Sequence, residues 1–391
     1  MSPSSKPIRV DRRRLLEIAH RLMAEYSPTG LARPALDALA QFLAEEGFDV
    51  ERPEAGHPSA PAVAVRLSGS GSGPTLQFNG HLDTVHLPFV PPRVAEDRLT
   101  GTGASDMKGG TAAAVEALLA LRDAGAVETG AILLTAHDLH EAPWGDGRQL
   151  DTLIRTGYVG DAVLLPEPLR DPLPVVGRGQ ACWRLQIERA GLPVHEVMRP
   201  PHEPNVIEAG AEFVRRWLEL DRSLSACSDP LAGRSTAFVG RFHAGEIYNG
   251  FPKAAELEGT RRWLPGGTFA EALEEFQSMI DRLSDDFGVA CEGNFRLVRD
   301  AFRLDEDHRF VSIFRGIHQE ISGRPIERGA KPFVDDGNSF WALAGIPAIT
   351  HGPIAGGQHT VSEWCSIDDL ERVATLYARV AVSFCTPDRA S

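Results

Sequence analysis

The spacing of apolar and polar positions predicts a chain that alternates between strands and helices. Residues 11–47 form two amphipathic segments separated by "SPTG", which is typical of a helix pair. Residues 61–67 and 74–85 have the pattern of strands, with "GSGSG" between them as a hairpin turn. A helix is predicted over 108–125, followed by two short apolar runs, "AILLTAHD" and "DAVLLPEP", that are typical of buried strands. This alternation favours an α/β fold with a mixed, mostly parallel sheet flanked by helices.

A second pattern begins near residue 179. There the predicted elements follow the order strand, helix, strand, strand, helix, strand, which fits a ferredoxin-like α+β sandwich. The first pattern returns with a helix over 308–323, a strand at "PAITHGP" and a final helix over 366–384. We therefore expect residues 1–178 and 301–391 to form one domain, with residues 179–300 inserted as another.

Several polar side chains fall where the predicted parallel strands end. His81 follows "LQFNG", Glu141 belongs to the cluster after "AILLTA", and Glu167 follows "AVLLP". Asp106 lies among small residues before a helix, and His359 lies in the loop "GGQHTVSEW". Chemistry in α/β sheets gathers at the carboxyl ends of strands. Two histidines, two glutamates and an aspartate suit a pair of divalent ions, with Asp106 placed to bridge them.

Composition narrows the class of protein and of partner. The 391 residues carry 54 acidic and 40 basic side chains, a net charge of −14, which argues against nucleic acid or an anionic membrane as partner. The five cysteines form no CxxC pair, and the N-terminus has no apolar signal core. We expect a cytoplasmic protein that acts on a small molecule. Serine hydrolases with GxSxG and single-zinc proteases with HExxH are disfavoured because both motifs are absent.

The chain resembles a known family of metal-dependent hydrolases. The segments "GHLDTV", "GTGASDMKGG", "LLPEP" and "GIPAITHGPIAGGQHTVSEWCSIDDL" match its motifs in order and spacing. This is the co-catalytic di-zinc metallopeptidase and amidohydrolase family of aminoacylase, carboxypeptidase G, acetylornithine deacetylase and succinyl-diaminopimelate desuccinylase. The resemblance covers nearly the whole chain. It implies a zinc-exopeptidase-like catalytic domain and a lid domain that joins two chains into a homodimer.

The resemblance also implies two divalent metal ions, with zinc expected and cobalt or manganese as alternatives. The implied ligands are His81, Asp106 and Glu167 for one ion, and Asp106, Glu141 and His359 for the other. Asp83 would hydrogen-bond the far nitrogen of His81 and fix its tautomer. The peptide bond between Asp106 and Met107 would be cis.

Further site residues follow from the same resemblance. His195 in "GLPVH" would reach the active site of the partner subunit and stabilise the developing oxyanion. Asn249 and Arg262 would contact the substrate carboxylate or carbonyl. The backbone N–H groups of Gly356 and Gly357 offer a cradle for a carboxylate.

The sequence departs from the family at "HDLHE". The family carries two consecutive glutamates there, a general base and then a metal ligand, but the base position in this chain holds His140. His140 itself can take the proton, since a free imidazole titrates near pH 6.5. Alternatively Asp138 is the base, or the base is lost, or the metal site has shifted so that His140 or His137 becomes a ligand. Otherwise His137 is expected to be a satisfied buried histidine.

The expected function is hydrolysis of an amide bond by metal-activated water, with an N-acyl amino acid or small peptide as substrate. Two alternatives stay open because the base position is altered. One is hydrolytic deamination of an unusual small substrate. The other is a catalytically silent member of the family with a binding or regulatory role.

Overall fold

A computed structural model describes residues 7–143 and 145–387, which divide into two compact units. The first unit runs to Val175 and also contains Arg303–Ala330 and the residues from Asp335 onward. The second contains Val176–Phe302 and Lys331–Val334. It is thus slightly longer at each end than the expected insertion and takes a short later segment as well. Residues 1–6, the start of the N-terminal segment that lacks an apolar signal core, lie outside the described residues.

The first unit is built on a five-stranded sheet. Its strands, in spatial order, are β1 (Val63–Ser68), β5 (Thr129–His137), β2 (Gly71–His81), β6 (Ala162–Leu165) and β18 (Ala348–Thr350). Only β1 is antiparallel to its neighbour, and the other pairs are parallel. The mixed, mostly parallel sheet predicted from the sequence is therefore confirmed.

The predicted hairpin at "GSGSG" is wrong. β1 and β2 do not pair with each other, because β5 lies between them and pairs with both. The glycines allow close packing instead. A Cβ on Gly71 would lie 2.8 Å from the Thr129 side chain, and one on Gly73 would lie 2.5 Å from the carbonyl oxygen of Cys385.

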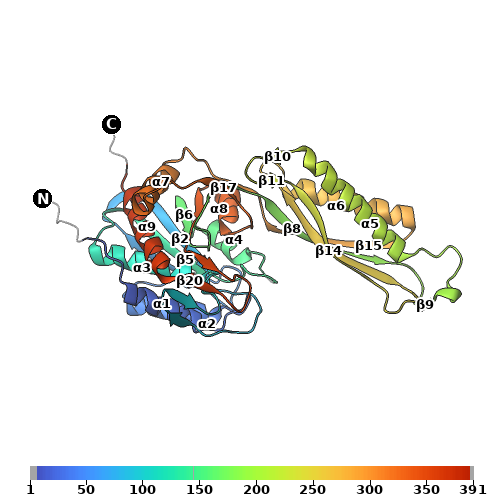
Figure 1. Ribbon diagram of the computed structural model, residues 1–391, viewed down its shortest axis with the longest axis horizontal. Coiled ribbons are helices and arrows are strands. Elements are labelled where there is room, and N and C mark those ends of the chain that lie inside the picture. The colour runs from blue at the N-terminus through green and yellow to red at the C-terminus, as the bar shows by residue number, and fades with distance from the viewer. Residues whose placement is uncertain (1–6, 144, 388–391) are drawn as a thin grey trace. The chain divides into compact units, whose positions relative to one another are not determined.

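Helices cover both faces of this sheet. They are α1 (Arg12–Met23), α2 (Arg33–Glu45), α3 (Lys108–Ala124), α4 (Arg148–Arg155), α7 (Arg309–Ser322), α8 (Asp336–Ala344) and α9 (Ile367–Cys385). Figure 1 shows α3 and α9 on one side of the sheet and α4 and α8 on the other. Burial from both sides explains why all four residues of β6 are apolar and buried. None of the described helices has the length and the uncharged apolar run needed to cross a membrane.

The chain also forms two smaller sheets of four and three strands. One has the order β19 (Ala355–Gly356), β20 (Trp364–Ser366), β4 (Arg98–Thr100) and β3 (Arg93–Ala95). The other has the order β16 (Phe302–Arg303), β7 (Leu173–Gly177) and β17 (Arg328–Lys331). The β19–β20 pair frames the loop that carries His359.

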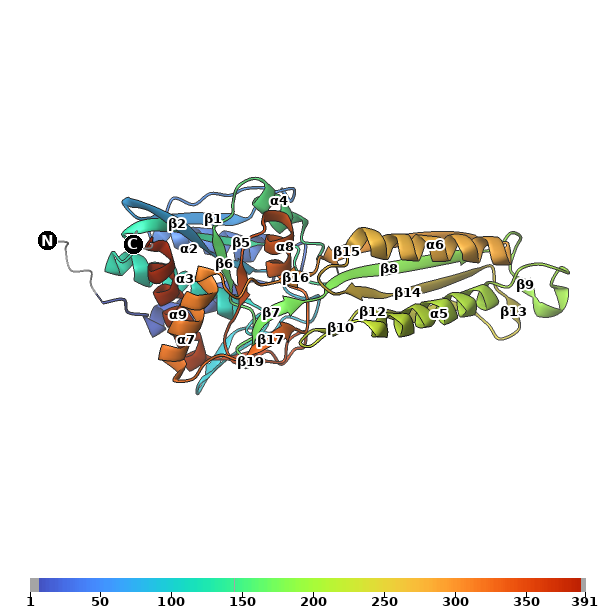
Figure 2. The same cartoon turned by 90° about the horizontal axis from the view of Figure 1, so that it is seen from above.

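The second unit has the predicted strand and helix order. Its four-stranded antiparallel sheet has the order β12 (Thr236–Ala244), β14 (Ala254–Trp263), β8 (Gly179–Glu188) and β15 (Ala290–Arg299). The helices α5 (Val206–Ser223) and α6 (Phe269–Phe287) lie along this sheet (Figure 2). The first and third strands in the chain occupy the centre, as in a ferredoxin-like sandwich. Short elements are β9 (Val194–His195), η1 (Glu196–Met198), η2 (Leu224–Ala226), β10 (Ser228–Asp229), β11 (Gly233–Arg234) and β13 (Gly250–Phe251).

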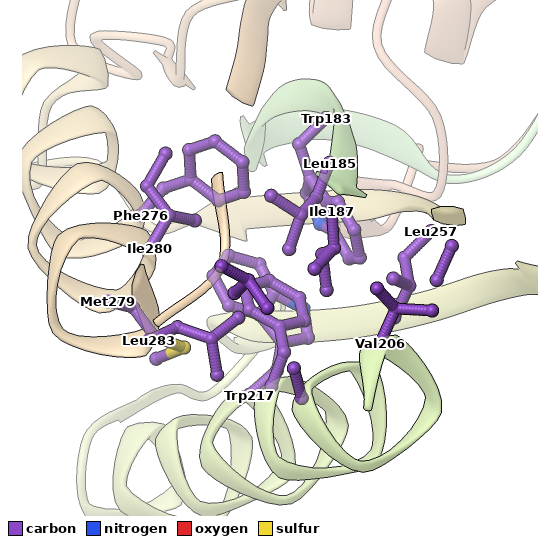
Figure 3. Close-up of a cluster of buried hydrophobic side chains, with 14 of the residues drawn as sticks. Trp183, Leu185, Ile187, Val206, Trp217, Leu257, Phe276, Met279, Ile280 and Leu283 are labelled. Atoms are coloured by element: carbon purple, nitrogen blue, oxygen red, sulfur yellow. The ribbon is translucent and has the colours of Figure 1, made fainter. Parts of the chain in front are cut away.

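An aromatic core fixes these two helices to one face of the sheet. Figure 3 shows Trp217 of α5 and Phe276 of α6 pointing toward Trp183 of β8. The ring centroids of Trp183 and Trp217 are 5.1 Å apart, and those of Trp183 and Phe276 are 5.9 Å apart. Buried aromatic pairs of this kind stabilise the packing beyond simple area burial. The second unit therefore has a core of its own.

Candidate metal centre and general base

The parallel strands of the first unit bring candidate residues to one edge of the sheet. His81 is the last residue of β2 and lies in register with His137, the last residue of β5. Glu167 comes two residues after β6, which also runs parallel to β2. Side chains that are far apart in the sequence therefore meet at the carboxyl ends of these strands.

Asp106 lies between two histidines at this edge. Its Oδ1 atom is 3.2 Å from Nε2 of His81, and its Oδ2 atom is 3.4 Å from Nε2 of His359. Glu167 Oε1 lies 3.6 Å from Nε2 of His81, and Glu141 Oε2 lies 3.2 Å from Nε2 of His359. The structure thus brings all five predicted ligands together, with Asp106 in the central place expected of a bridge.

Backbone contacts hold Asp106 in this position. It precedes α3, and the Asp106–Met107 peptide bond is cis, as the resemblance implied. The Glu363 carboxylate accepts hydrogen bonds from the backbone N–H groups of Ser105 and Asp106, each at 3.2 Å. Glu363 was not predicted from the sequence, although it lies only four residues after His359 and just before Trp364. We infer that Glu363 orients the loop that carries Asp106.

The crowded carboxylates of this cluster raise the pKa values of the groups around them, so the cluster favours bound protons or cations. Burial and the negative charge of Asp106 raise the pKa of Glu141 to about 7 and that of Glu167 to about 8. Contacts with Asp106 and Glu141 raise the pKa of His359 to about 10. Burial opposes the charged form of His81, but its carboxylate neighbours still raise its pKa well above the usual value. Carboxylates crowded in this way are stabilised by a bound cation.

The donor set fits divalent ions. Nε2 of His81 and Oδ1 of Asp106 are buried, and neither has a hydrogen-bond partner among the described residues. Ligand atoms of His81, Asp106 and Glu141 lie within 4.8 Å of one another, as do those of His81, His140 and Glu167. Imidazole nitrogens and carboxylate oxygens are the ligands of zinc and similar ions.

Asp83 positions the "HDLHE" segment through its carboxylate. Oδ2 of Asp83 accepts hydrogen bonds from the backbone N–H groups of His140 at 3.0 Å and Glu141 at 2.8 Å. The far nitrogen of His81, Nδ1, faces the carbonyl oxygen of Asp83 at 3.0 Å, whereas the carboxylate is 3.5 Å away. The expected contact with His81 is therefore made by the main chain of Asp83, because its carboxylate is engaged with the next loop.

His140 lies beside the ligand cluster. Its ring stacks on that of His81, with centroids 3.9 Å apart and planes 9° from parallel. Its Nδ1 atom is 2.8 Å from Oδ1 of Asp336, and its Nε2 atom is 3.7 Å from Oε1 of Glu167. Asp336, in the first turn of α8, was not predicted, because the Asp–Asp pair at 335–336 has the sequence pattern of a helix N-terminus. His140 therefore points one nitrogen at a buried carboxylate and the other at the cluster.

Asp138 and His137 face other neighbours. The Asp138 carboxylate accepts hydrogen bonds from the backbone N–H groups of Gly30, Ala32 and Leu139 and lies 3.1 Å from Nε2 of His57. These contacts disfavour Asp138 as a general base. His137 is fully buried, with Nε2 at 2.8 Å from Oδ2 of Asp336, as expected of a satisfied histidine.

The remaining predicted residues fall into two groups. In the second unit, Nδ2 of Asn249 is 3.0 Å from Nε2 of His195. Arg262 is the last residue but one of β14, whereas Asn249 precedes that strand. In the first unit, Gly356 pairs with Trp364, and Gly357 has a φ of 76° where the turn toward His359 begins. A Cβ on Gly357 would lie 2.4 Å from the carbonyl oxygen of Ser362, so these glycines shape the loop.

The chain is similar to known proteins along most of its length. Residues 77–383 match the pattern of a family described as peptidase family M20/M25/M40. The succinyl-diaminopimelate desuccinylase of Methylobacterium radiotolerans is 27% identical over 93% of this chain and 95% of its own. The aminopeptidase PepT of Bacillus cereus superposes with a TM-score of 0.80 at 17% identity, covering 96% and 100% of the two chains. The Bacillus subtilis YXEP protein, described as a dinuclear metal-binding peptidase, gives 0.68 at 15% identity, covering 95% and 98%.

Proposed function

The chain belongs to peptidase family M20/M25/M40, and from this premise we propose how its residues hydrolyse an amide bond. The protein is a metal-dependent hydrolase of carbon–nitrogen bonds that acts on acyl amino acids or peptides. The convergence of two histidines and three carboxylates on Asp106 is the observation that supports the mechanism most.

We assign the two ions to the ligands that surround Asp106. His81, Asp106 and Glu167 would hold one ion, and Asp106, Glu141 and His359 would hold the other. Zinc is the proposed metal because imidazole and carboxylate ligands suit it. When bound, such ions make a water molecule more acidic and polarise the substrate carbonyl.

His140 is the proposed general base. Nε2 of His140 accepts a proton from the attacking water as the oxygen–carbon bond forms. The same nitrogen then donates this proton to the amine nitrogen as the carbon–nitrogen bond breaks, so the base is regenerated. The position of the ring supports this role, because Nε2 points toward Glu167 and the ring packs on His81.

The substrate would be an N-acyl amino acid or a short peptide. Arg262 and Asn249 are proposed to bind its carboxylate or carbonyl, and the N–H groups of Gly356 and Gly357 would supply a second place for a carboxylate. Arg262 is half-buried, and its desolvation together with the charge of Arg178 lowers its pKa, so an anionic partner would be favourable.

We propose a homodimer formed through the second unit, in which His195 reaches the active site of the partner subunit and stabilises the oxyanion. β12 supports this because it is an edge strand of nine residues with an exposed Phe238. Long edge strands with exposed apolar side chains are prone to pair with another chain. A cytoplasmic location is also proposed, since the described cysteines form no disulfide.

Metal analysis combined with substrate screening tests the function. Purified protein should bind two divalent ions per chain and release the free amine from an N-acyl amino acid or a dipeptide. Chelation should abolish turnover, and added zinc, cobalt or manganese should restore it. Stoichiometric metal without turnover of any amide would contradict the proposal and favour a binding protein.

A further inference from the structure

We propose that Asp336 is the positioning residue of the general base: it fixes the tautomer and the orientation of His140 so that Nε2 faces the metal ligands. The inference rests on the proposed function, because it assigns a partner to the proposed base. It adds a residue that the sequence motifs did not indicate, and it explains how a histidine can work at this position.

A carboxylate at this place dictates which nitrogen of His140 carries the hydrogen. Oδ1 of Asp336 is 2.8 Å from Nδ1 of His140, and an ionised carboxylate only accepts hydrogen bonds. Burial disfavours the charged form of Asp336, but His137 and His140 keep its pKa well below the usual value, so it is ionised. Nδ1 must therefore donate, which leaves the lone pair of neutral His140 on Nε2.

Other side chains hold Asp336 rigidly. Its second oxygen, Oδ2, is 2.9 Å from the amide nitrogen of Asn79 and 2.8 Å from Nε2 of His137. Asn79 in turn accepts a hydrogen bond from Thr135 at 2.8 Å. All of these groups are buried at the ends of β2 and β5. Side chains of β2 and β5 thus hold the Oδ2 atom of Asp336, and the Oδ1 atom faces His140.

The contact between Asp336 and His140 also lowers the electrostatic cost of using a histidine as the base. Two bound dications would repel the imidazolium that forms when His140 takes a proton. The negative charge of Asp336, in direct contact with Nδ1, offsets that repulsion. A carboxylate that orients an imidazole and stabilises its protonated form is a recurring arrangement in enzymes with a histidine base.

The Asp336→Asn variant separates this role from simple packing. It keeps the shape of the side chain and replaces one acceptor oxygen of the carboxylate by an NH2 group, which is a donor. Its amide nitrogen is disfavoured at the Oδ2 position, where Asn79 already donates. The amide nitrogen is therefore directed toward Nδ1 of His140 and donates to it. His140 then carries its hydrogen on Nε2 and has no lone pair facing the metal ligands.

The expected result is a fall in kcat of about 10²–10⁴, the usual share of general acid–base catalysis, with little change in KM or metal content. Nitrogen-15 NMR of histidine-labelled, zinc-loaded protein should show His140 protonated on Nδ1 in the wild type and on Nε2 in Asp336→Asn. The resonances are assigned by comparison with His140→Gln. This second measurement needs no substrate.

Glu116→Gln is the matched control, because it makes the same carboxylate-to-amide change at an equally buried residue. Glu116 contacts Arg14 at 2.7 Å and accepts a hydrogen bond from the backbone N–H of Asp11 at 2.7 Å, so its change should lower the thermal midpoint. Glu116 takes no part in the hydrogen bonds that link Thr135 and Asn79 to Asp336, so kcat and the His140 tautomer should stay near those of the wild type.

Two outcomes would overturn the proposal. One is an Asp336→Asn variant with its metal and nearly normal kcat. The other is a wild-type His140 protonated on Nε2. Failure of the proposed function looks different: no amide would be hydrolysed by the wild type, while the NMR result would still report on Asp336.

Discussion

At the scale of single residues, His140 has the proposed role of general base. Two contacts define it: the carboxylate of Asp336 at Nδ1 and the ring of His81 stacked on its face. The Asp83 carboxylate also accepts a hydrogen bond from the backbone N–H of His140 and so fixes the main chain there. The proposed base is therefore held at one ring nitrogen, at the ring face and at the main chain, which suits a group that transfers a proton in a fixed direction.

Replacing His140 by alanine tests its assignment. We expect kcat to fall by about 10²–10⁴, because general-base catalysis is removed. Metal content, measured by elemental analysis, should change little if His140 is not a ligand. Asp138→Asn should be much milder for kcat, since Asp138 anchors the Gly30–Ala32 backbone. Loss of metal in His140→Ala would instead make His140 a ligand, and near-normal kcat would place the base elsewhere.

At the scale of elements, α3 packs closely against the end of β6 and so brings two proposed metal ligands together. Asp106 lies just before α3, and Glu167 lies just after β6. A Cβ built on Gly110 of α3 would come within 1.9 Å of the carbonyl oxygen of Pro166. The helix can approach the strand end this closely only because residue 110 has no side chain.

Gly110→Ala should therefore destabilise the protein and weaken metal binding together. Overpacking of this kind typically costs about 1–3 kcal/mol, and it pushes Asp106 away from Glu167. Gly316→Ala in α7 is the control, because nothing lies within 4 Å of its Cβ position and alanine favours a helix. Denaturant unfolding and metal titration of both variants check this. Unchanged metal affinity in a folded Gly110→Ala protein would show that this contact does not set the ligand spacing.

At the scale of the whole molecule, metal and proton binding are coupled to folding. In metal-free protein the pKa of Glu141 is raised to about 7, that of Glu167 to about 8 and that of His359 to about 10. In the unfolded chain a Glu titrates near pH 4.5 and a His near pH 6.5, so these groups hold extra protons in the folded chain from about pH 4.5 to about pH 10. The stability must therefore fall as pH rises through that window. Asp106, whose pKa is lowered, contributes only at more acidic pH.

The measurement is thermal unfolding of chelator-treated protein across this pH window. We expect the melting temperature of the metal-free protein to drop as pH rises, and the slope to shrink after zinc or manganese is added, because a bound cation replaces the protons. A metal-free melting temperature that is flat or rises with pH would contradict the assigned electrostatics of the cluster.

Assembly is the second property of the whole molecule. Phe238→Arg places a charge on the exposed side of the edge strand β12, so we expect light scattering to show a lower mass at low protein concentration. Leu273→Arg on α6 is the control, since that exposed leucine lies on the helix that packs on the opposite edge strand, β15. A wild-type protein that is a monomer at every concentration and fully active would contradict both the proposed dimer and the proposed role of His195.

The sequence by itself determined the order and type of the long elements and the candidate ligands, but it did not indicate the short helices α4 and α8. Local periodicity specified β6, α3 and the strand–helix order of the second unit, because burial on one or both faces leaves a pattern in the chain. Motif spacing singled out His81, Asp106, Glu141, Glu167 and His359. Tertiary structure decided what no local pattern records. The position of β5 between β1 and β2, the partner Asp336 for His140 and the binding of Asp138 to a distant loop all depend on contacts between segments far apart in sequence. A hydrogen bond across nearly 200 residues leaves no periodicity in the chain, so only the folded geometry shows which carboxylate meets which imidazole.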